Sequence, residues 1–126
     1  MKIITKNANG DLKTYDVYRV AGNRAEYISG DHSDLKKDKC IVSSNSGGVT
    51  KTSLGNRKSS INFVKTNEVD TRLAEKELTD AKIEILTSFP AGLSDDQVAD
   101  LIANAREFFT QSPDVLLQIV RKGMIS

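Results

Sequence analysis

The segment RKSSINFVKT, residues 57–66, decides the fold because its polar and apolar side chains alternate. Ile61 and Phe63 fall on one side of an extended chain. The polar side chains fall on the other side, and they are Lys58, Ser60 and Asn62. This period of two predicts a strand with one buried face and one polar face, which is typical of an antiparallel sheet.

Residues 79–89 repeat the pattern and predict a second strand of the same kind. Lys82 and Glu84 fall on its polar side. Its apolar side carries Ala81, Ile83 and Ile85. We expect Ile83 and Ile85 to fill the core together with the apolar side chains of the first strand.

Shorter β-like runs precede these two strands, at residues 2–6, 11–20, 24–29 and 39–43. The pair Asn9-Gly10 separates the first two runs and tolerates the positive φ of a hairpin turn. Residues 30–37 are polar and predict a loop. Residues 43–55 are rich in Gly and Ser, so we expect a long flexible tip there.

Two helices are predicted after Pro90 and Gly92 end the strand region. Ser94 and Gln97 have the spacing of a capping box, in which each side chain bonds the other residue's backbone N–H. Ser112-Pro113 predicts the start of a second helix that stops near Gly123. The helices carry an apolar stripe at helical spacing, consisting of Val98, Leu101, Ile102, Ala105, Phe108 and Phe109, continued by Leu116, Ile119 and Val120.

This order of elements predicts an α+β fold, an antiparallel sheet of six or seven strands followed by two helices. We expect one domain over residues 1–126, with the sheet in 1–90 and the helices in 94–123. Two amphipathic helices cover little of a broad sheet. The simplest way to cover the rest of the sheet is a second copy of the chain, so the apolar stripe is the expected dimer interface.

Composition narrows the class of protein further. With 38% hydrophobic and 28% charged residues, the chain is neither a disordered tract nor a membrane span. Its amino-terminal residues have no signal-peptide core, which argues against secretion. The single cysteine, Cys40, and the single histidine, His32, argue against disulfide, zinc and triad sites. We expect Cys40 in the core and His32 solvated in its loop.

Catalytic motifs are missing from the sequence. No helix follows Gly47-Gly48, so this pair does not predict a phosphate cradle. The carboxylates Glu75, Glu77 and Asp80 are interpreted as a solvated edge. We therefore predict no enzyme, no cofactor, no metal and no small-molecule substrate.

Charge is divided unevenly along the chain, whose net charge is +1. Residues 1–66 contain 12 Lys/Arg and 6 Asp/Glu, and residues 67–126 contain 6 and 11, giving +6 and −5. This favours a basic face for a polyanion, although the charges could simply be segregated along the chain. Residues 94–123 could be interpreted as a helix-turn-helix, but they are acidic, and a helix pair that binds phosphates should be basic. We therefore expect nucleic acid to bind the sheet.

Several segments together resemble the coat proteins of the small single-stranded RNA bacteriophages, the levivirus type. The resemblance covers nearly the whole chain in order and spacing. It rests on Gly10-Asp11-Leu12, Ala25-Glu26-Tyr27-Ile28-Ser29, the strand holding Cys40, Asn56-Arg57-Lys58, and the helix start at Ser94-Asp95.

This resemblance implies an intertwined homodimer with a continuous sheet, whose helices reach the partner subunit and lie outside a small icosahedral shell. It also implies an inner sheet face that meets the genome and binds an RNA hairpin, which represses translation and directs packaging. The protein would reside in the virion capsid, assembled in the cytoplasm of a bacterial host, without a membrane partner.

Residue by residue, the resemblance implies RNA contacts on three strands, from Lys39, Ser43, Asn56, Lys58, Ser60, Asn62, Lys82 and Glu84. Ile41 stands where the family has a small polar residue. The final strand lacks the family's base-stacking aromatic, and Asp80 lies near that position. The loop Ser44–Gly55 looks longer, and we expect it where neighbouring dimers meet.

Two other functions stay open at this point. A dimeric nucleic-acid-binding regulator of similar architecture would share the basic sheet but form no shell. A protein-interaction adaptor would use the apolar helix face and would not need the basic sheet.

Overall fold

The computed structural model describes residues 2–47, 55–73, 75–111 and 113–122. The chain forms two compact units, Met1–Ser88 and Phe89–Ser126. The first contains nearly all of the sheet and the second contains the two helices. The single-domain organisation expected from the sequence stays a prediction.

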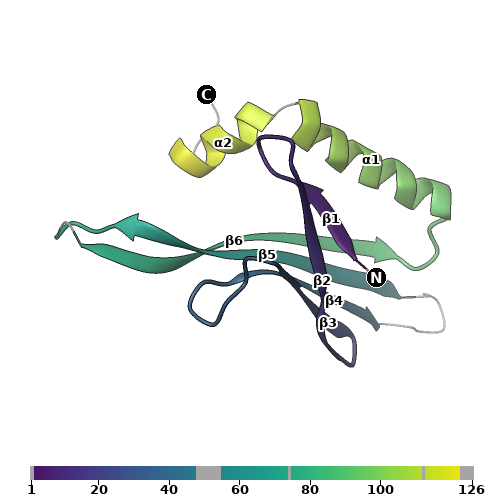
Figure 1. The fold of residues 1–126 in the computed structure, drawn as a ribbon. Coiled ribbons are helices and arrows are strands. Elements are labelled where there is room, and N and C mark those ends of the chain that lie inside the picture. Colours follow the sequence, from purple (N-terminus) through teal and green to yellow (C-terminus); the bar gives the residue numbers. More distant parts are fainter. Residues whose placement is uncertain (1, 48–54, 74, 112, 123–126) are drawn as a thin grey trace. The chain divides into compact units, whose positions relative to one another are not determined.

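Within the described residues the sheet has six strands, in the order of the chain (Figure 1). Neighbouring strands are antiparallel, a hairpin followed by a meander, as the sequence predicted. The strands are β1 (Ile3–Lys6), β2 (Leu12–Ala21), β3 (Arg24–Ser29), β4 (Asp38–Gly47), β5 (Asn56–Asp70) and β6 (Lys76–Pro90).

The predicted first hairpin turn is confirmed. The Asn7 side-chain oxygen accepts the backbone N–H groups of Asn9 and Asp11, both at 3.0 Å. Gly10 has φ +88°, a conformation that glycine adopts without a steric penalty. The turn thereby sets the β1–β2 register from Lys6↔Leu12 onward.

β4 is longer than the sequence suggested. Ser44 to Gly47 belong to the strand and pair with β5 as far as Gly47↔Asn56, so the predicted tip does not begin at residue 43. The Ser44 N–H donates to the Asn23 carbonyl at 3.0 Å. Ladder hydrogen bonds use the backbone, so polar side chains do not prevent pairing. The rest of the tip, residues 48–54, lies outside the described residues.

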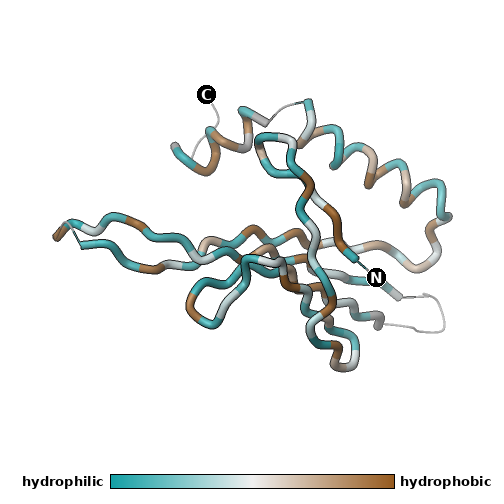
Figure 2. Tube along the Cα trace, viewed as in Figure 1, coloured by the Kyte–Doolittle hydropathy of each residue, from teal (hydrophilic) through white to brown (hydrophobic). Residues whose placement is uncertain are grey.

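β5 and β6 continue together beyond β4 (Figure 1). The β4 pairing ends at Asp38↔Lys65, whereas β5 extends to Asp70. Two side-chain hydrogen bonds join β5 and β6, one between the hydroxyls of Ser59 and Thr87 and one from Thr66 to Asp80. Both hydrogen bonds join residues that face each other in a single antiparallel register of β5 and β6. Hydrophobic and hydrophilic residues alternate along these strands (Figure 2).

The core is small and lies on one face of the sheet. Among the described side chains its buried apolar members are Tyr15, Tyr27 and Cys40. Cys40 is 0% exposed, as predicted, and burial raises the pKa of its thiol to about 11. Partly buried side chains pack around these three, and they are Ile3, Ala25, Val42, Ile61 and Phe63.

The expected contribution of β6 to this core is wrong for Ile83, which is 57% exposed. β6 is the last strand of the sheet, so it has a strand neighbour on one side only. The apolar alternation along β6 is present, but the core cluster of the described residues draws its side chains from β1 to β5.

A buried ion pair joins β2 to the start of β4. Lys13 Nζ lies 2.6 Å from Asp38 Oδ2, and Asp38 is buried. Burial lowers the pKa of Lys13, but the hydrogen bonds to Asp38 and Tyr15 outweigh burial and raise it overall. His32 is not simply solvated, because its Nδ1 accepts the Asp38 backbone N–H at 3.2 Å.

In the second unit, α1 (Asp95–Gln111) and α2 (Pro113–Lys122) confirm the two predicted helices. The capping box forms: Gln97 N–H donates to Ser94 Oγ at 3.2 Å, and Ser94 N–H donates to Gln97 Oε1 at 3.0 Å. Ser112 and Gly123 lie outside the described residues. Within the described residues, neither helix is long and apolar enough to cross a membrane.

The ion pair generates a stability prediction. Asp38→Ala leaves the Lys13 ammonium without its carboxylate against the core, and we expect a loss of roughly 2–4 kcal/mol, reduced by the partial exposure of Lys13. Urea unfolding at fixed protein concentration measures it. Asp34→Ala, at an exposed loop position, is the control and should change stability by under ~0.5 kcal/mol. Equal stability of the two variants would contradict the prediction.

Candidate nucleic-acid interface

The face of the sheet opposite the core, here called the polar face, is defined by the strand register. Tyr27, Cys40 and Phe63 stand opposite one another on the core face of β3, β4 and β5. Alternation therefore puts their chain neighbours on the polar face. They form rows across these strands, Arg24–Ser43–Ser60, Glu26–Ile41–Asn62 and Ile28–Lys39–Val64.

A shallow hollow of about 360 Å³, here called the central hollow, opens on the polar face. It contains five of the eight residues predicted to contact RNA, namely Ser43, Ser60, Asn62, Lys82 and Glu84. It also contains Arg24, Ile41 and Val64. The structure thus brings five of the predicted residues together, from β4, β5 and β6.

The hydrogen bonding in the central hollow leaves one acceptor open. Ser43 Oγ and Ser60 Oγ lie 2.7 Å apart and satisfy each other. Asn62 Oδ1 is buried and has no hydrogen-bond partner among the described residues. A buried acceptor without a partner is costly, and a donor on a ligand would satisfy it once the Asn62 side chain turned outward. The exocyclic amino group of a nucleobase is such a donor.

The charges at the β6 side of this hollow are paired with each other. Lys82 Nζ lies 3.7 Å from Glu84 Oε2, and both side chains are exposed. An exposed pair of this kind is weak, so its members can exchange partners. Lysine can then bind a phosphate and the carboxylate can accept from a base amino group.

The other three predicted residues lie outside the central hollow. Lys39 is on the polar face, where its Nζ lies 3.7 Å from Glu26 Oε1. Lys58 and Asn56 lie farther along β5, opposite Asn45 and Gly47, and both are exposed.

Two cations of the polar face were missed by the sequence reasoning. Arg24 lines the central hollow, and alternation along β3 opposite Ala25 and Tyr27 was a sufficient signal to find it. Arg19 pairs with Glu26 across a register shift in β2. The sequence carries no signal for that shift.

Asp80 is exposed on the last strand, in keeping with the solvated-edge interpretation, but it also has two side-chain partners. The Thr66 hydroxyl donates to Asp80 Oδ1 at 2.6 Å, and Lys37 Nζ lies 3.3 Å from Oδ2. The Thr66 hydrogen bond, followed by that of Lys37, lowers the pKa of Asp80. Glu75 and Glu77 are exposed. The described residues contain no cluster of His, Cys, Asp or Glu that could hold a metal ion.

The order of six antiparallel strands and two helices is the fold of the RNA-phage coat proteins. No protein-family model matches the sequence, and no curated protein matches it. The similarity of this chain to known proteins is therefore found by comparing structures.

Three solved structures illustrate the similarity. The virus-like particle protein of Wenzhou levi-like virus 4 has a TM-score of 0.78 at 16% identity, covering 100% of this chain and 89% of that chain. The virus-like particle protein of Beihai levi-like virus 32 has a TM-score of 0.77 at 17% identity, covering 90% of this chain and 88% of that chain. The capsid protein of bacteriophage GA has a TM-score of 0.68 at 16% identity, covering 96% and 93%.

The Asp80 contacts generate a titration prediction. Thr66→Val removes the main hydrogen bond that lowers the Asp80 pKa, so the pKa should rise toward the ordinary aspartate value in a carboxyl NMR titration. A lowered folded-state pKa stabilises the protein above the unfolded pKa, and this stabilisation is lost as pH falls through the folded pKa. Acid unfolding of Thr66→Val should therefore begin at higher pH.

The matched control is Thr87→Val, which also removes a cross-strand hydroxyl contact, to Ser59. It should leave the Asp80 titration unchanged. An unaltered Asp80 pKa in Thr66→Val would show that Lys37 alone holds the carboxylate ionised.

Proposed function

We propose that this chain is a non-enzymatic capsid protein whose dimers assemble into a small icosahedral shell around a single-stranded RNA genome. The observation that carries the proposal is similarity over nearly the full length to three capsid or virus-like particle proteins, with at least 88% of both chains covered. On this proposal the protein resides in the virion capsid after assembly in the cytoplasm of a bacterial host.

Electron microscopy of the protein purified after expression alone tests shell formation. Closed particles of uniform size are expected. A dimeric nucleic-acid-binding regulator, the alternative function, would bind RNA as free dimers and give no particles at any protein concentration tested.

Dimerisation is supported by apolar surface that a single chain leaves in water. α1 has no buried residue, and Leu101 and Ile102 are 55% and 56% exposed. Burying one such side chain contributes ~1.5–3 kcal/mol, so a partner that covers several of them stabilises the dimer strongly. The proposed interface contains Val98, Leu101, Ile102, Ala105, Phe108, Phe109, Ile119 and Val120. The side chain of Leu116, also predicted there, lies outside the described residues.

Phe108→Asp tests this interface. Phe108 and Phe109 are exposed, with ring centroids 5.5 Å apart, and a carboxylate in the middle of the stripe cannot be buried without a partner. We expect loss of both soluble dimer and particles, measured by light scattering after gel filtration. Asn104→Asp, which adds the same charge at an exposed α1 position outside the stripe, should assemble normally. A folded wild-type monomer at micromolar concentration would refute the proposal.

RNA binding on the polar face is supported by the chemistry gathered there. Lys39, Lys58 and Lys82 can neutralise phosphates. Ser60 and Asn62 offer short hydrogen-bonding groups to the edges of unstacked loop bases, and Asn62 Oδ1 has no partner among the described residues. Ser43, Asn56 and Glu84 complete the proposed RNA-contact set. Recognition of one RNA hairpin by this set would repress translation and direct packaging of the genome.

Three substitutions separate these roles. Lys58→Ala should weaken binding of all RNAs and reduce the salt slope by roughly 0.7–1 unit. Asn62→Ala should change preference among hairpin sequences by roughly 1–3 kcal/mol, by analogy with base readout in DNA. Arg106→Ala, on α1, is the control and should change neither. RNA affinity across a salt series measures all three, and an effect of the α1 variant alone would overturn the assignment to the sheet.

A further inference from the structure

β2 contains a β-bulge at Tyr18. Val17 stands opposite Tyr27 and Arg19 stands opposite Glu26, so Tyr18 has no residue of its own across the β2–β3 ladder. In an unbroken strand Arg19 would follow Tyr15 and Val17 on the core side. The bulge brings Arg19 to the polar face instead, beside Tyr18, since such irregularities redirect side chains.

Around Glu26, three cations of the described residues converge on one carboxylate. Arg19 holds Glu26 Oε2 through Nη2 at 2.9 Å and Nε at 3.0 Å. Arg24 Nη2 and Lys39 Nζ lie 3.6 and 3.7 Å from Oε1. The Glu26 side chain is only 12% exposed, and its single negative charge neutralises only one of the three cations. The group keeps a net positive charge on the sheet surface, which suits phosphate.

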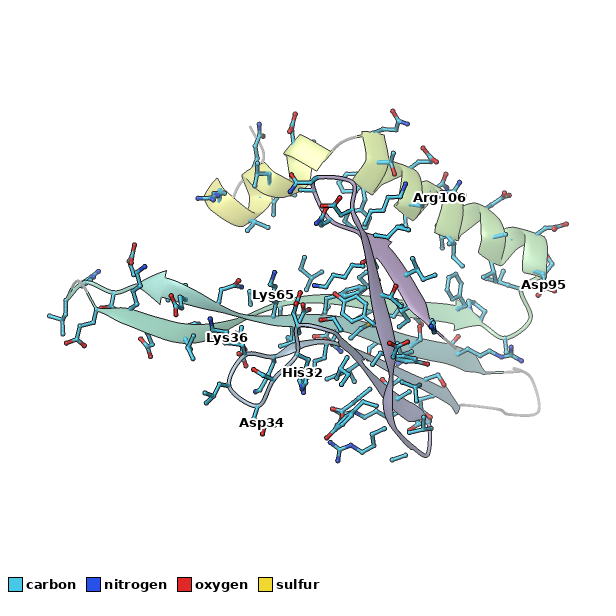
Figure 3. The ribbon with its side chains drawn as sticks, viewed as in Figure 1. His32, Asp34, Lys36, Lys65, Asp95 and Arg106 are labelled. Carbon is cyan, nitrogen blue, oxygen red and sulfur yellow. The ribbon has the colours of Figure 1, made fainter. Side chains whose placement is uncertain are left out.

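An exposed aromatic ring stands beside this charge. Of the three tyrosines, Tyr15 and Tyr27 are buried and Tyr18 is 61% exposed. The Arg19 guanidinium carbon lies 5.8 Å from the Tyr18 ring centroid. The ring also lies 6.4 Å from that of His32, which belongs with Asp34 to the loop between β3 and β4 (Figure 3).

Two further hollows lie beside these side chains, and one of them shares Arg24 with the central hollow. One, of about 180 Å³, is lined by Arg19, Ala21, Arg24 and Glu26. The other, of about 190 Å³, includes Tyr18, Arg19, Glu26, His32, Asp34 and Lys39 among its lining residues. Arg24 lines both the first of these and the central hollow. A single-stranded RNA that lies over Asn62 can therefore continue past Arg24 to Tyr18.

We propose that Tyr18, Arg19 and Arg24 form a second nucleotide subsite, where an unpaired base of single-stranded RNA stacks on Tyr18 and the adjoining phosphates contact the arginines. This subsite rests on the proposed RNA-binding function, and its three residues are none of the eight in the RNA-contact set. Base–aromatic stacking tolerates any base, and arginine forks match phosphate oxygens. An acidic peptide would use the arginines but would have no need of the tyrosine ring.

Affinity for a labelled single-stranded 12-nucleotide oligoadenylate, measured at two salt concentrations, tests the subsite. Tyr18→Leu should weaken binding by between about 5-fold and about 150-fold, the range for loss of one stacked base. Tyr18→Phe keeps the ring and should bind as wild type. Val20→Ala, at another exposed β2 position, is the matched control. Arg19→Ala and Arg24→Ala should each lower the salt slope by roughly 0.7 unit.

The outcomes separate the subsite from the proposed function. If wild type binds and Asn62→Ala weakens binding while Tyr18→Leu does not, the subsite is overturned and RNA binding stands. Equal losses in Tyr18→Phe and Tyr18→Leu overturn stacking, because the hydroxyl alone would then matter. If the arginine variants weaken binding of oligoadenylate and polyglutamate equally and Tyr18→Leu weakens neither, the site is a general anion surface. If wild type binds no RNA, both proposals fail.

Discussion

The register of the antiparallel ladder is the constraint on which the rest of the structure depends. Tyr27, Cys40 and Phe63 stand opposite one another, and this row places the core on one face of β3, β4 and β5. A slip of one residue in any of these strands would exchange its buried and polar side chains. The row Glu26–Ile41–Asn62 on the other face is therefore fixed by the same pairing that builds the core.

Much of the apolar surface of the described residues is exposed. The buried apolar residues of the described part number three, whereas Ile83 on β6 and four large residues of the α1 stripe are exposed, namely Leu101, Ile102, Phe108 and Phe109. Lys13 and Asp38 add an ion pair between β2 and β4, in which Asp38 is buried. The chain thus combines an ordered ladder with a small core, a combination that favours burial against a second subunit.

Alternation was enough to predict most of the strands and the polar face, and together with the family resemblance it pointed to five of the eight residues of the central hollow. It succeeded because a period of two specifies a face wherever the ladder is regular, as it is between β4 and β5. It failed where other forces decide. Ser44 to Gly47 extend β4 through backbone bonds that their side chains do not reveal, and Asp80 is held by Thr66 and Lys37 from distant parts of the chain. The exposure of Ile83 follows from the place of β6 at the end of the sheet, which periodicity does not encode.

The β2 bulge is the most consequential feature that the sequence concealed. Read with a strict period of two, Arg19 belongs with Tyr15 on the core side, and Glu26 would then stand without its closest cation on the polar face. The inserted residue resolves this conflict, because it places Tyr18 and Arg19 side by side and lets the guanidinium reach Glu26 at 2.9 Å. β6 has no aromatic side chain among the residues around Lys82 and Glu84. The exposed tyrosine, Tyr18, lies on β2. If the polar face binds single-stranded RNA, stacking chemistry is therefore available at the β2–β3 side and hydrogen-bonding chemistry at Asn62, with Arg24 between them.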